Sequence, residues 1–408
     1  MRSTSVRRLG TGLAAAAVAG AAGCASPSAA VTGGSATGGA DVKIGVITGK
    51  TGPYATYGAE YLAGLNAGID YVTGGTGKIG GHRIVLVVKD DADDPATAVA
   101  EAKDLIGQGV ELLGGSVDSA IALQVAAIAA QNKVLFVAGP AATDKLDGLN
   151  RYTFRSGRQT YQDIATAGTF VGDLTGKHVL VLAQDSVFGT ANAAGVKAVL
   201  GAKGAQVSSV LVPPSATDFT PFTQRIVSAK PDLLFVAWAG SNATQLWTAL
   251  DQQGVLGSTR VVTGLANTAT YPATGAAGAK IEFLAHYFAG AGAGNPIESA
   301  MTADVRKAGG TVDLFTPDGF TAAQLFAHAV TAAPGDAAKQ ITALEGWSFD
   351  GVAGRYTVRA GDHALLQPEF QAALTGSGTS WTPTLVKALA PDAVAPPPAA
   401  AAWNTSGS

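Results

Sequence analysis

The sequence is poor in several residue types, and each scarcity excludes a class of protein. Only one cysteine occurs among 408 residues, which excludes a disulfide scaffold and a zinc site built from paired cysteines. Charged residues make up only 14%, with 27 basic against 30 acidic side chains. The resulting net charge of −3 argues against a nucleic-acid-binding protein. Apolar residues are abundant, at 47%, and this excludes general disorder. The length predicts about two domains.

The single cysteine, Cys24, follows a segment with the pattern of an export signal. Residues 1–8 carry three arginines, and residues 9–23 form an uncharged apolar run too short to span a membrane comfortably. The run ends in Ala-Ala-Gly-Cys, which resembles a bacterial lipobox, although Ala21 stands where leucine is usual. We expect a signal peptide over residues 1–23 and a lipid on Cys24. Ordinary cleavage beside an incidental cysteine, or twin-arginine export, remains the alternative.

Two further segments have the composition of flexible chain. Residues 24–40 are rich in Gly, Ser, Ala and Thr, and are expected to form a lipid-anchored tether. Residues 391–408 are rich in Pro and Ala, and are expected to be a disordered tail. The folded body is therefore expected between them.

Strand-like apolar runs alternate with helical periodicity from residue 42 to residue 263. The predicted strands are 42–48, 83–88, 110–113, 134–138, 178–183, 207–212, 233–238 and 260–263. The predicted helices are 57–72, 95–107, 119–132, 160–174, 191–200, 222–229 and 243–253. Such alternation is typical of parallel sheets covered on both faces, and the strands are too many for one compact sheet. We therefore predict an α/β protein with two doubly wound parallel-sheet lobes, whose ligand residues lie in the loops after the strands.

Motifs of common enzymes are absent or incomplete. Residues 45–51 (GVITGKT) are one residue short of a phosphate-binding loop, and no dinucleotide fingerprint follows the first strand. No nucleophile-elbow motif is present either. The histidines have no metal-ligand spacing and are expected at the surface or at strand edges: His82, His178, His286, His328 and His363. The sequence therefore predicts neither a catalytic residue, nor a metal, nor a cofactor.

An acidic run follows the second predicted strand and has two interpretations. It contains Asp90, Asp91, Asp93 and Asp94. It could form a cation site, or it could be a solvated loop in which Asp94 caps the helix that Pro95 begins. The second interpretation is preferred, because a strand-end loop before a helix commonly has this composition.

The ordered set of strand-end loops resembles the leucine/isoleucine/valine-binding protein family, the type I periplasmic solute-binding proteins of ABC importers. The resemblance runs over about residues 41–375 and begins with VKIGVITGKTGPYATYGAEYLAGLNAGIDYV. It continues through DDADDPATAVAEAKDLI, GGSVDSAIAL, VLFVAGPAATDKL, FRSGRQTYQD, QDSVFGTANA, DGFTAAQLF and FDGVAGR. The family fold implies two lobes joined by three hinge crossings. The first lobe is then expected over residues 41–156 and 287–347, and the second over residues 157–286 and 348–390.

The resemblance also implies which residues contact a ligand. In the first lobe these are Tyr54, Tyr57, Asp118, Ser119, Ala141, Ala142, Thr143, Asp318 and Phe320; in the second they are Phe188, Trp238, Ser241 and Asn267. Ser119 begins a predicted helix and could offer a site for an anion, or it could simply cap that helix. In the family, the segment equivalent to residues 141–143 contributes a carbonyl, an N–H and a threonine hydroxyl. The equivalent position of Tyr57 is an aromatic pocket wall, although a core tyrosine is the alternative.

One departure from the family limits what the resemblance implies about the ligand. Many members place a glutamate near residues 265–267 to pair with an α-ammonium, and this sequence has no acid there. Either Asp118 or Asp318 replaces it, or the ligand is not a zwitterionic amino acid. The segment DSAIAL resembles aromatic-acid binders more than branched-chain amino-acid binders.

The expected function is therefore capture of a small polar or carboxylate-bearing solute between two closing lobes. An amino acid, an amide or an aromatic acid would fit. The implied partners are an ABC permease and its ATPase, with a lipid anchor on the extracytoplasmic face of the cell membrane and a monomeric protein. A ligand-sensing receptor domain of the same fold is the alternative, and an α/β enzyme is the alternative from another class.

Overall fold

The computed structural model describes residues 39–238, 242–378, 380–401 and 403. The predictions on the signal peptide, Cys24, the tether up to residue 38 and Ser241 lie outside these described residues. No helix in the described residues is long and apolar enough to cross a membrane.

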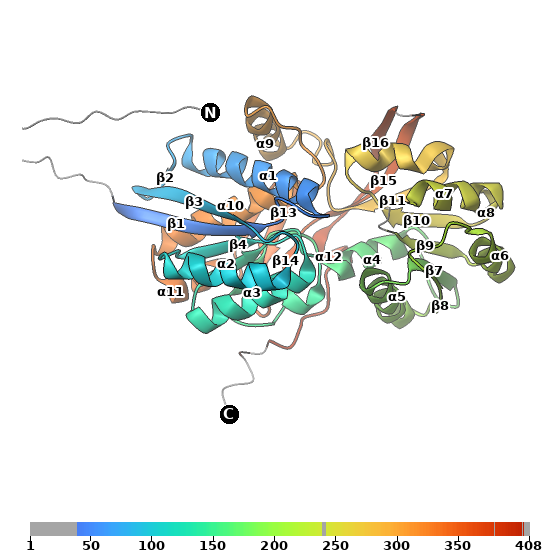
Figure 1. Cartoon of the computed structure of the whole chain (residues 1–408), viewed down its shortest axis with the longest axis horizontal. Helices are drawn as coiled ribbons and strands as arrows, with labels where there is room; N and C mark the ends of the chain where they lie inside the picture. The colour runs from blue at the N-terminus through green and yellow to red at the C-terminus, as the bar shows by residue number, and fades with distance from the viewer. Residues whose placement is uncertain (1–38, 239–241, 379, 402, 404–408) are drawn as a thin grey trace, which may run out of the picture. The chain divides into compact units, whose positions relative to one another are not determined.

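The first sheet has six strands in the order β2-β3-β1-β4-β5-β6 (Figure 1). Its elements are β1 (Gly39–Thr48), α1 (Ala55–Thr73), β2 (Lys78–Ile79), β3 (His82–Asp90), α2 (Pro95–Gly107), β4 (Leu112–Gly115), α3 (Ser119–Asn132), β5 (Leu135–Ala138), η1 (Asp144–Leu146) and β6 (Thr153–Arg155). All neighbouring strands are parallel except β2, which pairs with β3 in the antiparallel direction.

The second sheet has seven strands in the order β16-β15-β11-β10-β9-β7-β8. Its elements are α4 (Thr160–Thr169), β7 (His178–Gln184), α5 (Val187–Val199), η2 (Gly201–Lys203), β8 (Gln206–Val212), α6 (Thr220–Ala229), β9 (Leu233–Ala237), α7 (Ala243–Gln252), α8 (Val255–Ser258), β10 (Arg260–Gly264), η3 (Thr268–Lys280), β11 (Glu282–Ala285), β15 (Glu369–Ser377) and β16 (Ser380–Leu389). The strands from β8 to β11 are parallel, whereas β15 and β16 add an antiparallel pair at the edge.

The remaining elements lie outside the two large sheets. They are α9 (Pro296–Lys307), α10 (Thr316–Ala332), α11 (Ala337–Leu344), β12 (Ser348–Gly351), β13 (Gly354–Val358), β14 (Leu365–Leu366) and α12 (Pro391–Val394). Strands β12, β13 and β14 form a small antiparallel sheet of their own. The fold is thus two doubly wound lobes, each built on a mainly parallel sheet, as the alternation of strands and helices predicts.

The position of the last crossing between the lobes differs from the expected one. The sequence places it after residue 347, but Phe349, Tyr356 and Leu365 pack in the same buried cluster as Val42 and Phe326 of the first lobe. The chain enters the second sheet only at β15, so the crossing lies at residues 367–368. The physical reason is the aromatic face of β12 and β13, which is buried only against the first lobe.

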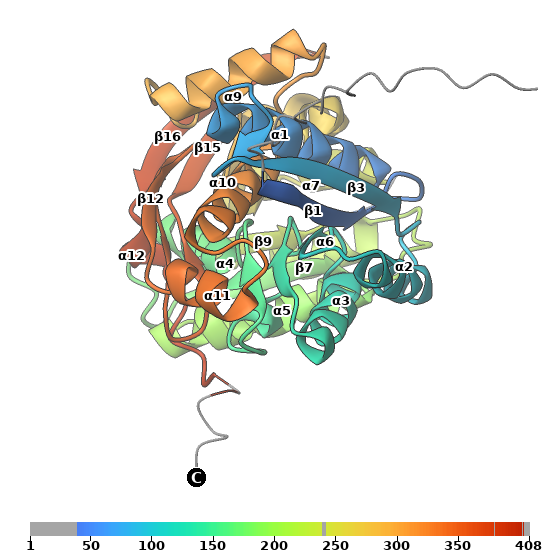
Figure 2. The same cartoon turned by 90° about the vertical axis from the view of Figure 1, so that its left-hand side faces the viewer.

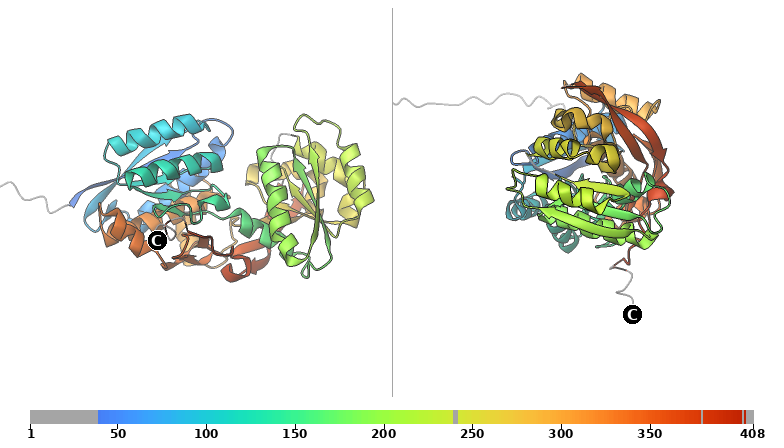
Figure 3. Two further views of the ribbon diagram at one scale, coloured as in Figure 1. Left: turned by 90° about the horizontal axis from the view of Figure 1, so that it is seen from below. Right: turned by 90° about the vertical axis from the view of Figure 1, so that its right-hand side faces the viewer.

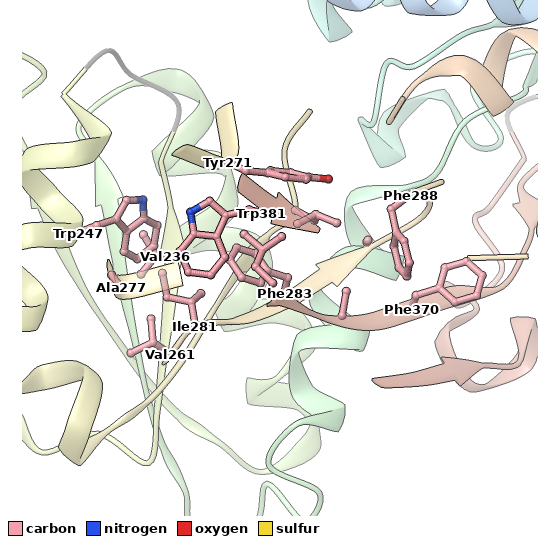
Figure 4. Packing of buried hydrophobic residues seen from close by; sticks show 14 of the residues in the cluster. Val236, Trp247, Val261, Tyr271, Ala277, Ile281, Phe283, Phe288, Phe370 and Trp381 are labelled. Carbon is pink, nitrogen blue, oxygen red and sulfur yellow. The ribbon is translucent and has the colours of Figure 1, made fainter. Parts of the chain in front are cut away.

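Each sheet is buried by helices on both faces (Figures 2 and 3). In the first lobe, α1 and α10 cover one face, and α2 and α3 cover the other. In the second lobe, α4 and α5 cover one face, and α6 and α7 cover the other. Figure 4 shows aromatic members of the largest cluster, in which Phe288 and Phe370 meet edge to face with ring centroids 6.1 Å apart. Burial on both faces explains why the strands are continuously apolar.

Helices α1 and α10 approach more closely than side chains would normally allow. A Cβ atom at Gly64 would lie 1.7 Å from the carbonyl oxygen of Thr316, and one at Gly319 would lie 1.9 Å from that of Tyr61. A Cβ atom at Gly68 would lie 2.6 Å from Ala323 Cβ. Glycine at these positions lets the two backbones touch, and this contact joins segments about 250 residues apart in sequence.

The predicted elements up to residue 263 are found, with differences at their ends. Helices α2 and α3 have the predicted bounds, and the Asp94 carboxylate accepts a hydrogen bond from Thr97 N at 2.7 Å as the predicted cap. Helix α5 begins four residues earlier than predicted, because Ser186 caps it by accepting from Gly189 N. The short strands β2 and β6 and the short helix α8 were not predicted.

The expected disordered tail is wrong for the residues that are described. Residues 391–394 form α12, and Val394 and Ala401 are buried. The N–H of Ala399 donates to Asp362 Oδ2 at 2.8 Å. Composition alone suggested disorder, but these few apolar and backbone contacts lie far apart in sequence and leave no periodic pattern.

The glycine contact between α1 and α10 gives a direct prediction. Replacing Gly64 with Ala forces the two backbones apart and should lower the free energy of unfolding by about 3 kcal/mol. Gly107→Ala is the matched control, because nothing lies near its added Cβ, and it should leave stability unchanged or raise it by about 0.5 kcal/mol. Urea unfolding followed by circular dichroism measures both. Equal stabilities for the two variants would contradict the close backbone contact.

Candidate functional site

The two sheets repeat one strand order, and this places candidate loops at equivalent points. In the first lobe the order β3-β1-β4-β5-β6 changes direction between β1 and β4. In the second lobe the order β8-β7-β9-β10-β11 changes direction between β7 and β9. Ligands of doubly wound sheets bind beyond the carboxyl ends of the strands at such a point. The loops after β1, β4, β7 and β9 are therefore the first candidates.

The acidic run holds the loop after β1 in place. Asp90 accepts from the N–H groups of Lys50 at 2.8 Å and Thr51 at 3.2 Å, and Asp93 accepts from Tyr54 N at 2.8 Å. Although partial burial acts in the opposite direction, these donors lower the pKa of Asp90 to about 2. The N–H groups of Lys50 and Thr51, at the end of the incomplete phosphate-binding motif, are thus already bonded to a carboxylate.

Asp91 lies in the loop after β3 and connects it to the loop after β4. It is fully buried, accepts from Ser116 Oγ at 3.1 Å and also accepts from Asp93 N at 3.0 Å. The expectation of a solvated acidic loop is therefore wrong for Asp91, because its buried carboxylate joins the loops after β3 and β4. Within the described residues, no three His, Cys, Asp or Glu side chains lie close enough together to hold a metal ion.

The start of α3 differs from the expected anion site. Asp118 is the capping residue, and its Oδ1 accepts from Ala120 N at 2.7 Å and from Ile121 N at 2.9 Å. Ser119 is the first helical residue and is half-buried. Because the Asp118 carboxylate already occupies these donors, the helix N-terminus does not offer them to an anionic ligand.

The loop of Ala141, Ala142 and Thr143 has its carbonyls engaged. The buried Arg155 donates to Ala141 O at 2.9 Å and to Thr143 O at 3.3 Å, and it pairs with Asp147 at 2.8 Å. Thr160 donates to the carbonyl of Ala142 from both its N–H and its hydroxyl. Among the described residues, no acceptor is found for the N–H groups of Ala142 and Thr143. This loop is therefore suited to donating to a carboxylate rather than accepting from a ligand.

An aromatic group lies beside these loops. The rings of Tyr54 and Tyr57 are stacked 6.0 Å apart, and Tyr57 meets Phe315 edge to face at 4.8 Å. Phe315 also stacks on His286 at 5.6 Å, and the Arg158 guanidinium lies 5.3 Å from its ring centroid. Tyr54 is 37% exposed, whereas Tyr57 is half-buried. Such rings suit an apolar ligand body or a cation.

Asp318 and Phe320 have different surroundings from each other. Asp318 is buried, with Oδ1 3.5 Å from His286 Nε2, whereas its Oδ2 finds no hydrogen-bond donor in the described part of the chain. Phe320 is fully buried against Tyr71, with ring centroids 5.2 Å apart, and is a core residue. Phe315, five residues earlier, belongs to the aromatic group instead. The histidines are expected at the surface or at strand edges. His286 is buried but directly follows strand β11, whereas His363 is buried between β13 and β14.

Asn267 reaches from the second lobe to a carboxylate of the first. Its Nδ2 donates to Glu60 Oε1 at 3.2 Å, and Glu60 Oε2 accepts from Phe315 N at 3.1 Å. Burial raises the pKa of Glu60 to about 7, and the nearby Asp313 and Asp318 add to the effect. The loop at 265–267 lacks an acid of its own, yet α1 brings one to it.

The second lobe presents two aromatic side chains on the predicted loops. Phe188 lies in the first turn of α5 and is 49% exposed. Trp238 follows β9, donates from Nε1 to Asn242 Oδ1 at 3.1 Å, and packs against Phe219. Ser241 lies outside the described residues. Both aromatic residues thus sit where the strand order changes direction.

The sequence predictions missed Glu60, Arg155, Arg158, His286 and Phe315. A usable signal existed for Glu60, which is three residues after Tyr57 and so shares its helix face. No local pattern marks the others, because their roles depend on contacts between segments far apart in sequence.

The buried Glu60 gives a prediction for stability against pH. Its raised pKa means that the folded state binds a proton that the unfolded state releases, so wild-type stability should fall as pH rises from about 4.5 to 7. Glu60→Gln removes this dependence. The free energy of unfolding of the variant, compared with that of wild type, should therefore increase by up to about 3 kcal/mol between pH 4.5 and pH 8. Urea unfolding at several pH values measures it, with Asp70→Asn, at an exposed position of the same helix, as the control. Parallel profiles for wild type and Glu60→Gln would contradict the assignment.

Comparisons with known proteins agree with this architecture. The sequence profile of the periplasmic binding protein family matches residues 41–379. A Leu/Ile/Val-binding protein, BraC3 of Rhizobium johnstonii, is 32% identical over 199 residues, covering 48% of this chain and 54% of that protein. A Leu/Ile/Val-binding protein homolog of Brucella melitensis is 29% identical over 238 residues, which cover 56% of this chain and 63% of that protein. The chain thus matches a little over half the length of these curated relatives.

Solved structures are similar over most of the chain. A structure described as an ABC-type branched-chain amino acid transporter from Rhodopseudomonas palustris has 30% identity and a TM-score of 0.76, covering 88% of this chain and 99% of its own. A solute-binding protein of the same species, in complex with 4-hydroxybenzoate, shares the fold at 23% identity and a TM-score of 0.75, covering 86% and 97%. The profile match over most of the chain, on two doubly wound lobes, shows that this protein belongs to the periplasmic binding protein family.

Proposed function

We propose that the protein is the extracytoplasmic solute-binding component of an ABC importer. One observation carries the proposal: both lobes repeat the same strand order, and each carries aromatic side chains on loops at its change of direction. A solute that contacts both sets of loops favours the closed arrangement of the lobes, because only there does it make all its contacts. The similarity to a structure described as a branched-chain amino acid transporter supports import over catalysis.

The ligand is a small carboxylate-bearing solute, such as an amino acid or an aromatic acid. The N–H groups of Ala142 and Thr143, with the Thr143 hydroxyl, form the carboxylate contact. Tyr54, Tyr57 and Phe188 enclose the ligand body, and Trp238, Ser119, Ser241 and Asn267 complete the walls. Asp118 and Asp318 are the candidate partners of a ligand cation. This assignment follows the donors and rings described above, together with the family resemblance.

The protein works as a monomer held at the extracytoplasmic face of the cell membrane by a lipid on Cys24. It passes its ligand to a permease driven by an ATPase. The basic start, the short apolar run and the small residues before Cys24 support this assignment.

The ligand contact at Thr143 can be tested directly. A thermal-shift screen of amino acids, amides and aromatic acids should find a stabilising ligand, because binding to the folded state raises the melting temperature. Thr143→Ala should then lower the affinity for that ligand roughly tenfold, as measured by calorimetry, which corresponds to one lost hydrogen bond. Thr342→Ala, on the exposed face of α11, is the control. Unchanged affinity in Thr143→Ala would refute the assignment.

The membrane anchor is tested by fractionating cells. Cys24→Ser should move the protein from the membrane fraction to the soluble extracytoplasmic fraction, since no thiol remains to carry the lipid. Ser26→Ala, two residues away, should leave it at the membrane. Membrane association that persists in Cys24→Ser would exclude the lipid anchor.

A further inference from the structure

The segment after β16 is attached to the second lobe at its start. Leu389, the last residue of β16, and Val394 of α12 are buried in the cluster that also contains Ile164 of α4 and Val196 of α5. Helix α12 packs directly against α4. These contacts hold residues 389–394 on the second lobe.

The same segment is attached to the first lobe a few residues later. Arg359 Nη1 donates to Pro396 O at 2.7 Å, and Asp362 Oδ2 accepts from Ala399 N at 2.8 Å. Arg359 and Asp362 also form an ion pair at 2.6 Å, which holds both acceptor and donor in place. Further along, the Trp403 ring lies 4.7 Å from that of His363.

The receiving surface is itself firmly built into the first lobe. The Asp362 carbonyl accepts from Gly148 N at 2.8 Å, and His363 Nδ1 lies 2.9 Å from Thr153 O on β6. A Cβ atom at Gly148 would approach Ala399, Ala400 and Ala401 at 3.3 Å, so the segment lies directly on this loop.

The connection between the two attachments is short and stiff. Only Ala395 separates Val394 on the second lobe from Pro396 on the first, so the chain between their Cα atoms spans at most about 7 Å. Pro396, Pro397 and Pro398 follow, and each restricts its own φ angle. Such a link transmits movement of one lobe to the other and has little slack.

The link also lies near other passages between the lobes. Helix α4, against which α12 packs, begins directly after the chain leaves β6. Residues 359–363 directly precede β14 and the passage at residues 367–368. This segment lies beyond residue 379, where the match to the family profile ends.

We propose that the described residues 391–401 and 403 are a strap that forms an additional connection between the lobes and restrains their relative rotation. By limiting how far the lobes open, the strap keeps the unliganded protein close to the closed arrangement of the lobes. The device rests on the proposed function for its purpose, but the restraint itself exists without any ligand.

Distance measurements between the lobes test the strap in the full chain. Spin labels at Lys103 on α2 and Lys197 on α5, both exposed, report the interlobe distance by double electron–electron resonance in a Cys24→Ser background. Arg359→Gln removes the donors to the Pro396 and Pro397 carbonyls, and Ala399→Pro removes the N–H that Asp362 accepts. Val394→Asp disrupts the attachment to the second lobe.

Matched variants control for general loss of stability. Arg355→Gln removes a neighbouring arginine of β13 that pairs with Asp350 and makes no hydrogen bond to the described strap residues. Ala400→Pro alters an exposed strap residue whose N–H donates to no acceptor in the described part of the chain. Circular dichroism first establishes that each variant is folded.

Without ligand, the strap variants should broaden the distance distribution roughly twofold, and the controls should match wild type. Identical distributions for all folded variants would overturn the strap, whatever the ligand screen finds. Failure of the screen to find any ligand, with broadened distributions in the strap variants, would instead count against the proposed function and leave the strap supported.

Discussion

The contact between α1 and α10 is the constraint on which the rest of the first lobe depends. The second lobe is inserted between these two helices in sequence, so the first lobe is completed only when a late helix returns to an early one. Gly64, Gly68 and Gly319 let the two backbones meet without intervening side chains. That meeting brings Tyr57 and Glu60 of α1 against Phe315, at the start of α10. The contact that completes the lobe therefore also brings the residues of the candidate site together.

The arrangement of charges around the site follows from the same geometry. Carboxylates at the ends of parallel strands are used mainly to hold backbone N–H groups, as Asp90, Asp91, Asp93 and Asp118 show. Arg155 performs the complementary task by donating to backbone carbonyls. Among the described residues, the N–H groups of Ala142 and Thr143 have no internal acceptor, and the proposed ligand contacts are placed there.

Most of the architecture could be predicted from the sequence, because local signals are strong in doubly wound folds. Asp94 before Pro95 marks the start of α2, and the apolar run at residues 178–183 marks β7. The passage at residues 367–368 could not be located, since it depends on aromatic burial of Phe349 and Tyr356 against distant strands. Aromatic positions such as Tyr57 could be named from the resemblance, but the pairing of Asn267 with Glu60 depends on two lobes meeting. Tertiary contacts of this kind leave no periodicity to detect.

The support of the loop after β1 has a consequence for how its side chains can vary. The carboxylates of Asp90 and Asp93 bind that loop chiefly through its main-chain N–H groups, at Lys50, Thr51 and Tyr54. Main-chain donors are present whatever the side chain, proline excepted. The side chain at position 54 can therefore be exchanged without releasing the loop from its support. The main-chain support of the loop can therefore stay constant while its side chains vary, which makes the loop a natural place to alter the proposed ligand contacts.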